Sequence, residues 1–129
     1  PPGAIDELDV ADVESERAHD YASPAPRGGW AVTSLVGGVF DGGRIIPAGE
    51  RESFTARASS ARAAFVVRSD EPIDARLEIG GETLDVAANG ARDRWIEAES
   101  RAIAIHDGDR ATLVARAPLR DFHVWIVSR

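Results

Sequence analysis

Histidine is the side chain best suited to acid–base catalysis near neutral pH, because imidazole titrates at a pH of about 6.5. The sequence contains three histidines, and His19, His106 and His123 lie in three separate segments. It contains no Gly-x-Ser-x-Gly turn, the strained loop that presents many nucleophilic serines. We therefore expect ordinary surface or strand histidines and a chain that is not an enzyme. A small hydrolase that uses His106 or His123 is the alternative.

Glu97 and Glu99 are the best-spaced carboxylates for glycoside hydrolysis. Residues two apart on a strand point to the same face and lie roughly 7 Å apart, a separation that glycosidases can use. Alternating glutamates on a strand more often mark a solvated face, and the chain is short for a glycosidase cleft. The sequence therefore predicts no catalytic residues.

Two groups of acidic residues could hold a metal ion. His106, Asp107 and Asp109 surround Gly108, but Asp-Gly-Asp is also what a tight turn between strands requires, and the turn is favoured. The first 26 residues carry seven Asp and Glu, which could supply carboxylates to a structural calcium ion. A simply solvated segment is the favoured interpretation there. No cofactor is therefore expected, and structural calcium is the alternative.

The aromatic residues suggest a different chemistry. Trp30, Trp95, Trp125 and Tyr21 are all the indoles and phenols of the chain, and each has a charged residue within a few positions. Sugars stack their C–H faces on indole rings and form hydrogen bonds to charged side chains. The mixture is compatible with a glycan site, although each tryptophan taken alone is more often a core residue.

The end of the chain indicates where such a site would lie. A strand over residues 121–128 places Phe122, Val124 and Ile126 on one face. The same strand places His123, Trp125 and Val127 on the other face. The uniformly apolar face is expected in the core, which leaves an exposed indole beside His123 on the outside. The predicted ligand-binding residues are Trp125, His123, Arg120, Asp121, Trp95 and Trp30.

The sequence pattern predicts that short strands position these residues. Gly, Pro, Asn and Asp separate the strands about every ten residues. No helix-length amphipathic segment interrupts the eight or nine strands expected, which favours an antiparallel, all-β jelly-roll sandwich. The clearest signal is a hairpin over residues 75–86, in which Gly80 and Gly81 supply the positive φ of a two-residue turn. Its aliphatic face is expected in the core. That face consists of Leu77, Ile79, Leu84 and Val86.

Composition divides the chain at residue 26. Residues 1–26 form an acidic, irregular, strand-poor N-terminal segment, in which residues 9–19 allow a short helix that Pro24 and Pro26 prevent from continuing. Residues 27–129 form the β-sandwich domain. The absence of Met and the start at Pro1-Pro2-Gly3 favour a domain cut from a longer polypeptide.

The overall charge excludes several partners. A net charge of -7 lacks the phosphate attraction behind nucleic-acid binding, so DNA and RNA are not expected as partners. The longest apolar run is too short for membrane insertion, and the absence of cysteine excludes disulfides. All fifteen basic residues are Arg, which suggests a bacterial genome of high GC content.

Several short motifs together resemble a bacterial accessory module. They are Trp30 and the stretches 39–44, 64–70, 95–97 and 122–125. The chain resembles the carbohydrate-binding-like jelly-roll domains appended to larger bacterial envelope or membrane proteins that handle glycans. The resemblance implies a non-catalytic, extracytoplasmic domain whose partner is a glycan or another protein domain. A structural or protein-interaction module of an envelope protein is the alternative function.

Overall fold

The computed structural model describes residues 1–24, 30–91 and 93–129, without the side chains of Trp30 and Ala31. These residues form twelve strands and one helix, so there are more strands than the eight or nine expected. The strand pairings between them are all antiparallel, which confirms the predicted fold class. No helix within these ranges is both long and apolar enough to cross a membrane.

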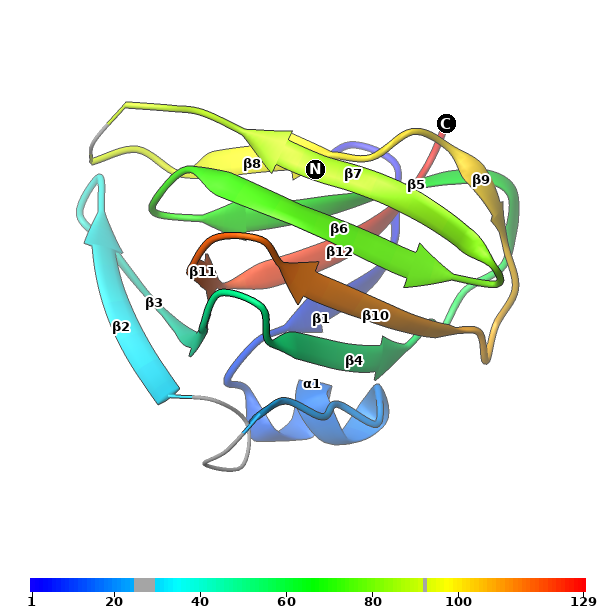
Figure 1. Ribbon diagram of the computed structural model, residues 1–129, viewed down its shortest axis with the longest axis horizontal. Helices are drawn as coiled ribbons and strands as arrows, with labels where there is room; N and C mark the ends of the chain where they lie inside the picture. The colour runs from blue at the N-terminus through cyan, green and yellow to red at the C-terminus, as the bar shows by residue number, and fades with distance from the viewer. Residues whose placement is uncertain (25–29, 92) are drawn as a thin grey trace.

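Two sheets form the layers of a sandwich (Figure 1). The five-stranded sheet has the order β1 (Ala4–Asp9), β12 (His123–Ser128), β5 (Ser60–Ser69) and β8 (Ile96–Glu99), with β9 (Ile103–Ile105) also paired to β5. The four-stranded sheet has the order β4 (Arg51–Thr55), β10 (Arg110–Ala115), β6 (Ile73–Ile79) and β7 (Glu82–Ala88).

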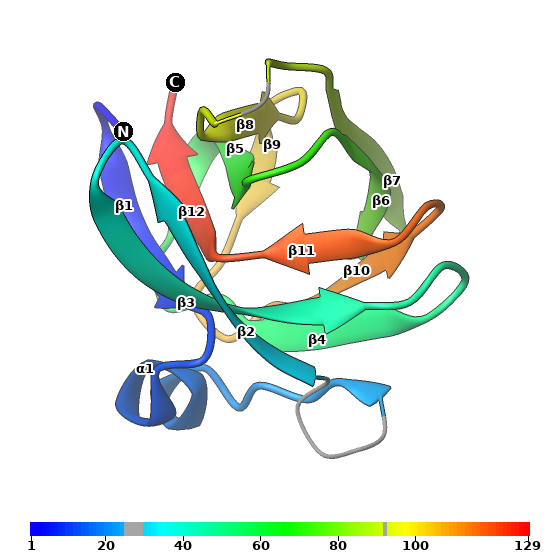
Figure 2. The same cartoon turned by 90° about the vertical axis from the view of Figure 1, so that its left-hand side faces the viewer.

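A third, smaller sheet lies at one end of the sandwich, where Figure 2 looks directly at it. It consists of β11 (Leu119–Asp121), β3 (Val39–Ile46) and β2 (Trp30–Val36), in that order. The helix α1 (Val13–Ala18) lies below the sandwich in the same view. The long β2–β3 hairpin is therefore placed beside β1 and beside β12, the strand that carries the predicted site residues His123 and Trp125.

The core lies between the two large sheets. Val124 and Ile126 of β12 belong to one buried cluster with Leu77 of β6 and Leu113 of β10. Phe54 of the four-stranded sheet meets Phe65 of the five-stranded sheet edge to face, with ring centroids 6.2 Å apart. The inward face predicted for the last strand is therefore confirmed for Val124 and Ile126.

The β6–β7 hairpin has the turn that its sequence predicts. Gly80 and Gly81 have φ values of 56° and 80°, the left-handed conformation of a primed two-residue turn. The four aliphatic residues predicted in the core are at most 4% exposed. Strand alternation and turn chemistry were sufficient to predict this element.

The N-terminal segment is not strand-poor, and that prediction was wrong. Residues Ala4–Asp9 form β1, an edge strand paired with β12. The acidic side chains hid the strand, because Glu7 and Asp9 point outward while Leu8 is only 1% exposed. The short helix expected within residues 9–19 does form, and Asp12 caps it by accepting a 2.9 Å hydrogen bond from the Ser15 amide.

The last strand is broken at Phe122. β11 ends at Asp121 and pairs with β3, whereas β12 begins at His123 and pairs with β1 and β5. Phe122 is the crossing point between the two sheets, and its amide donates to the Arg68 carbonyl at 3.0 Å. It is fully buried, as expected, but it lies outside the core cluster that contains Val124 and Ile126.

The Asp107-Gly108-Asp109 segment is a turn, as predicted. Asp109 accepts a 2.9 Å hydrogen bond from the His106 amide, and Gly108 has a φ of 94°. The flanking strands do not form a hairpin, because β9 pairs with β5 in one sheet and β10 with β4 and β6 in the other. The turn carries the chain from one layer of the sandwich to the other.

Candidate ligand-binding surface

The outward-pointing residues of the five-stranded sheet form one row across four strands. The strand register aligns Asp9 of β1, His123 of β12, Arg68 of β5 and Glu97 of β8. The neighbouring row contains Trp125, which lies opposite Val66. We call these five polar and aromatic residues, Asp9, His123, Trp125, Arg68 and Glu97, the outer face.

His123 lies among three acidic residues from two strands, β1 and β3. Its Nε2 lies 2.5 Å from Asp41 Oδ2 on β3, while its Nδ1 lies 3.2 Å from Glu7 Oε2 and 3.6 Å from Asp9 Oδ1. Burial raises the pKa of Asp9 and the opposite charge of His123 lowers it, with a net rise above its ordinary value. The imidazole therefore has carboxylates on both sides, Asp41 at one nitrogen and Glu7 and Asp9 at the other.

The His123 ring also stacks on Trp125, with centroids 4.9 Å apart and an interplanar angle of 13°. The Arg68 guanidinium lies 4.8 Å from the centroid of the same indole. Trp125 is consequently only 7% exposed, so the expectation of an exposed indole at this position was wrong. The side chains that were expected to surround a sugar cover the ring instead.

Trp95 is the described tryptophan that keeps partial exposure. Its ring packs edge to face on Phe122, with centroids 5.0 Å apart, and lies 5.6 Å from the Arg68 guanidinium. It directly precedes β8, at the same end of the sandwich as the β2–β3 hairpin (Figure 2). Arg68 therefore contacts both Trp95 and Trp125, the tryptophan of the outer face.

The structure separates the remaining predicted residues. Arg120 forms two hydrogen bonds with Asp70, of 2.7 Å and 3.0 Å, and its guanidinium lies 6.0 Å from the Phe122 ring. Asp121 is 0% exposed and points inward, so its predicted place on a ligand surface was wrong. The side chain of Trp30 lies outside the described part of the chain.

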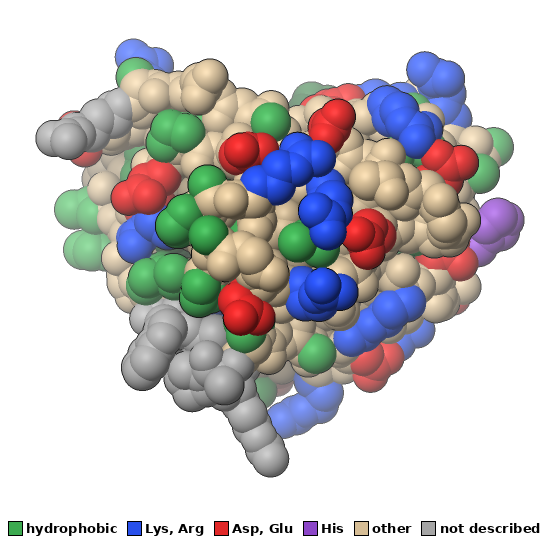
Figure 3. Space-filling view, in the orientation of Figure 1, with side chains coloured by type: hydrophobic (Ala, Val, Ile, Leu, Met, Phe, Trp, Pro, Cys, Tyr) green, Lys and Arg blue, Asp and Glu red, His purple; other side chains and the backbone are tan. Residues whose placement is uncertain are grey.

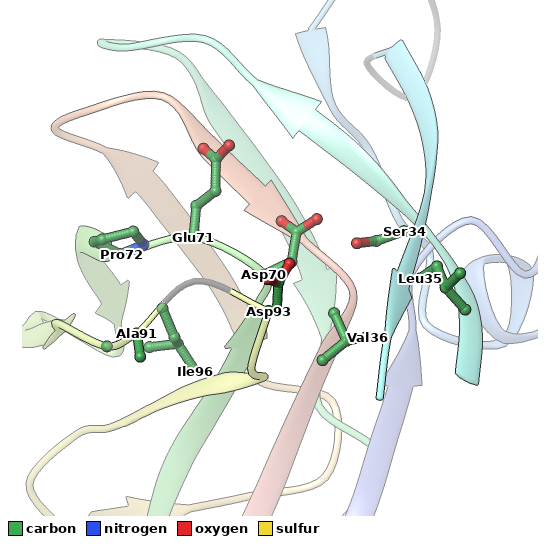
Figure 4. A pocket seen from close by; sticks show the side chains of 10 residues that line it. Ser34, Leu35, Val36, Asp70, Glu71, Pro72, Ala91, Asp93 and Ile96 are labelled. Carbon is green, nitrogen blue, oxygen red and sulfur yellow. The ribbon is translucent and has the colours of Figure 1, made fainter. Parts of the chain in front are cut away.

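A cleft opens next to these residues, between the β2–β3 hairpin, the β5–β6 loop and the segment before β8 (Figure 4). Its volume is about 380 Å³, within the range of roughly 300 to 1,000 Å³ that small-molecule sites occupy. In Figure 4 the side chains of Ser34 and Val36 point towards it from β2, whereas Leu35 points away. Asp70, Glu71 and Asp93 contribute carboxylates.

Asp70 lines the cleft and accepts hydrogen bonds from Arg120. Burial raises the pKa of this carboxyl, but hydrogen bonds from Arg120 and Ser34 and the charge of Arg120 lower it by more, which leaves the pKa below its ordinary value. Asp70 is therefore ionised near neutral pH and fixed in orientation. A rigid carboxylate beside a hydroxyl and aliphatic side chains can accept hydrogen bonds from sugar hydroxyls while C–H groups pack nearby.

Sequence reasoning missed the residues that line this cleft. Asp70 and Asp93 belong to no recognisable binding motif. A polar residue between strands is normally interpreted as part of a turn. Asp93 has a φ of 62°, a left-handed conformation that only the folded chain reveals. The stretches 64–70 and 95–97, which carried part of the resemblance, contain Asp70 and Ile96 of the lining and were the available signals.

One group in the described part of the chain has the spacing of a metal site. Ligand atoms of Asp9, Asp41 and His123 all lie within 4.8 Å of one another. An imidazole with two carboxylates suits a transition metal better than calcium, which prefers oxygen ligands. Asp9 of this group lies in the acidic N-terminal segment.

The opposite face of the sandwich contrasts with the outer face. In Figure 3 the four-stranded sheet presents blue and red side chains close together. Arg116 pairs with Asp74 and Asp85, and Arg76 pairs with Glu78. Phe54, the aromatic residue of these four strands, points into the core. This face is a solvated set of ion pairs and offers no ring to a ligand.

No protein-family model matches the chain, and no curated protein sequence matches it. Solved structures do share its fold. The domain CsCBM6-3 from Clostridium stercorarium, in complex with cellobiose, superimposes with a TM-score of 0.59 at 13% identity, covering 96% of this chain and 94% of that one.

Two further structures give similar values. The carbohydrate-binding module CBM6cm-2 of Cellvibrio mixtus lichenase 5A, in complex with cellotriose, has a TM-score of 0.55 at 14% identity and covers 98% of both chains. The CBM36-1 domain of a multidomain xylanase from the hindgut metagenome of Trinervitermes trinervoides has a TM-score of 0.56 at 19% identity, covering 84% of this chain and 90% of that one. The chain has the jelly-roll sandwich fold of carbohydrate-binding modules.

Proposed function

We propose that this chain is a non-catalytic module that binds a glycan in the cleft between the β2–β3 hairpin and the segment before β8. The observation that carries the proposal is the cleft itself, about 380 Å³ in volume and lined by carboxylates, a hydroxyl and aliphatic side chains. Such a lining suits a ligand with many hydroxyls and apolar C–H faces. The partly exposed indole of Trp95 adjoins Ile96, which lines the cleft.

The shared fold supports the same function. Structures with this fold were solved in complex with cellobiose and cellotriose, and a third is one domain of a multidomain xylanase. By analogy the present chain works as an accessory part of a longer, extracytoplasmic polypeptide of the cell envelope. The low sequence identities leave the sugar unspecified, so the first experiment is a glycan array probed with this chain.

Variants of the cleft test the site once a sugar is found. Asp93→Asn keeps a residue that tolerates a positive φ and removes one charged acceptor, so affinity should fall about tenfold. Trp95→Ala should weaken binding further by removing the ring. Asp107→Asn, on the exposed turn before β10, is the matched control and should bind like the wild type. Binding that is unchanged in both cleft variants would place the site elsewhere.

The histidines bear on the alternative of a hydrolase. His123 does lie within hydrogen-bond distance of a carboxylate, Asp41, as that alternative required. Its other nitrogen faces Glu7 and Asp9, so the described contacts give it no hydroxyl nucleophile to activate. His19 is buried between Asp6 and the Ser15 carbonyl. These contacts support structural roles for both residues and a module without catalytic activity.

A protein-interaction module remains the second candidate, because of one apolar patch. Leu35, Val39 and Phe40 at the tip of the β2–β3 hairpin are 53%, 60% and 72% exposed. Leu35 and Phe40 are paired across the hairpin on the side that turns away from the cleft. Phe40→Ser should abolish binding to a protein partner or self-association and leave sugar binding unchanged, which separates the two functions.

A further inference from the structure

Strand β2 lies at the end of the third sheet, and its pairing within the described residues is with β3. The other side of such a strand presents a row of backbone N–H and C=O groups that can pair with a further strand. Folded proteins usually protect a free strand edge with charged side chains, proline, a bulge or a covering segment. The edge of β2 can be examined for each of these protections.

Charge protects the other strands that end a sheet. Strands β1, β4, β7, β8 and β11 all occupy such positions, and each contains at least one Asp or Glu. Strand β9, which pairs with β5, is only three residues long. Strand β2 is seven residues long and contains neither a charged residue nor a proline. Among the described edge strands longer than three residues, β2 is therefore the one without charge.

The edge of β2 is also regular and uncovered by other described residues. Its register with β3 is unbroken along the whole strand, whereas β1 contains an irregularity in its pairing with β12. The free side of β4 is partly covered, because Ala22 and Ser53 exchange backbone hydrogen bonds of 2.7 Å and 2.9 Å. Outside the β2–β3 ladder, residues 30–36 form no such backbone bond to another described residue. The strand is therefore competent to accept a partner strand.

Charge also indicates which partner fits this edge. The chain carries a net charge of -7 and its other edge strands are acidic, so most contacts between two copies are repulsive. A contact between the β2 strands of two copies brings no charged residue of either strand together. Identical strands that pair antiparallel are related by a two-fold axis, which closes the assembly at a dimer. Leu35, which is 53% exposed, would gain a cross-strand neighbour in this pair.

We propose that the chain forms a two-fold dimer in which the β2 strands of two copies pair edge to edge in antiparallel orientation. The dimer joins the two third sheets into one continuous sheet. This proposal rests on the second candidate function above, protein interaction, and identifies its partner as a second copy of the chain. Thr33 lies at the middle of β2, where it is exposed, and does not line the cleft. Substitutions at Thr33 therefore test the pairing without changing a residue of the glycan site.

The test is sedimentation equilibrium over a range of protein concentrations up to about 1 mM. The mass of the wild type should rise from that of one chain to that of two. Thr33→Lys and Thr33→Glu should each stay monomeric, because like charges that face each other across a strand pair are destabilising. An equimolar mixture of the two variants should recover the dimer, because opposite charges then face each other. Thr83→Lys, at an exposed position of the edge strand β7, is the matched control and should dimerise like the wild type.

A second measurement needs no variant and covers the case in which the Thr33 variants do not fold. Amide hydrogen exchange of residues 30–36 in the wild type should slow as the protein concentration rises, while exchange in β7 should not change. A wild type that is monomeric at about 1 mM would overturn the proposal. A dimer that persists in both Thr33 variants would overturn it in favour of another surface. A chain that dimerises through β2 but binds no glycan would keep this proposal and contradict only the glycan function.

Discussion

Arg68 is the residue that gives the two described tryptophans different roles. Its guanidinium lies 4.8 Å from the Trp125 ring and 5.6 Å from the Trp95 ring, and it also donates to Glu97 at 3.1 Å. A desolvated cation–π contact contributes about 2 kcal/mol, against about 0.5 to 1 kcal/mol when exposed. Trp125, covered by Arg68 and His123, is therefore structural, and Trp95 is the indole available to a ligand.

Replacing Trp125 by Ala measures this difference. Because the indole is only 7% exposed, Trp125→Ala should lower the free energy of unfolding by about 3 to 5 kcal/mol in urea titration. Trp95→Ala, at a partly exposed position, should cost less stability, and it should reduce iodide quenching of the tryptophan fluorescence more than Trp125→Ala does. A loss below about 1 kcal/mol for Trp125→Ala would contradict a structural role and return it to the ligand surface.

The Asp70–Arg120 pair makes stability depend on pH in a defined direction. The pKa of Asp70 is lowered in the folded chain relative to its ordinary value. The pair therefore stabilises the fold at pH values above the ordinary carboxyl pKa. This contribution is lost as the pH falls through the lowered pKa of the folded state. Asp70→Asn should therefore be less stable than wild type at pH 7, by about 1.5 to 3 kcal/mol, with the difference disappearing in acid. Urea titrations at several pH values measure it, and a difference that persists at the lowest pH would contradict the assignment.

At the scale of elements, β3 lies so close to Asp121 and Phe122 that it limits which side chains the β2–β3 hairpin can carry. A Cβ placed on Gly43 would lie 2.5 Å from the Asp121 carbonyl oxygen and 2.8 Å from Phe122 Cδ1. The neighbouring Gly42 has its nearest such atom, Ala11 Cβ, at 3.8 Å, an ordinary contact. Gly43 is therefore required for the close approach of the third sheet to the point where the chain changes sheets.

These adjacent glycines form a matched pair of tests. Gly43→Ala should destabilise the chain by about 1 to 3 kcal/mol, because backbone atoms must shift to admit the methyl group. Gly42→Ala should leave the urea midpoint nearly unchanged. Equal effects of the two substitutions would show that the hairpin does not press on Phe122 as described.

Strands with a regular alternation of apolar and polar side chains and clear turns were predictable. Strand β1, whose outward residues are acidic, and the break at Phe122 were not. The β6–β7 hairpin followed from its Gly-Gly turn. β1 was missed because Glu7 and Asp9, which face His123, resemble a solvated tail. The break at Phe122 was missed because alternation continues through it while the pairing partner changes.

At the scale of the whole molecule, the candidate site depends on the meeting of segments that are distant in sequence. The fold class follows from strand periodicity, which is a local property. The cleft combines Ser34 of β2, Asp70 after β5 and Asp93 before β8, and no local pattern predicts that meeting. The sequence predicted Trp95 as a ligand-binding residue and Arg120 as a neighbour of Trp125, but the burial of Asp121 beside Glu52 of β4 depends on packing that no local pattern predicts.

The pairing of the first and last strands has a mechanical consequence. β1 and β12 are antiparallel neighbours, and Arg129 still contacts the chain start by donating to the Pro2 carbonyl at 3.1 Å. The two ends therefore leave the domain side by side. Tension applied between them, as between flanking domains of a stretched polypeptide, would open the hydrogen bonds of this pair one after another instead of shearing them together. In single-molecule pulling we expect β1 to peel off at low force before the sandwich ruptures, and a single high-force event would contradict this.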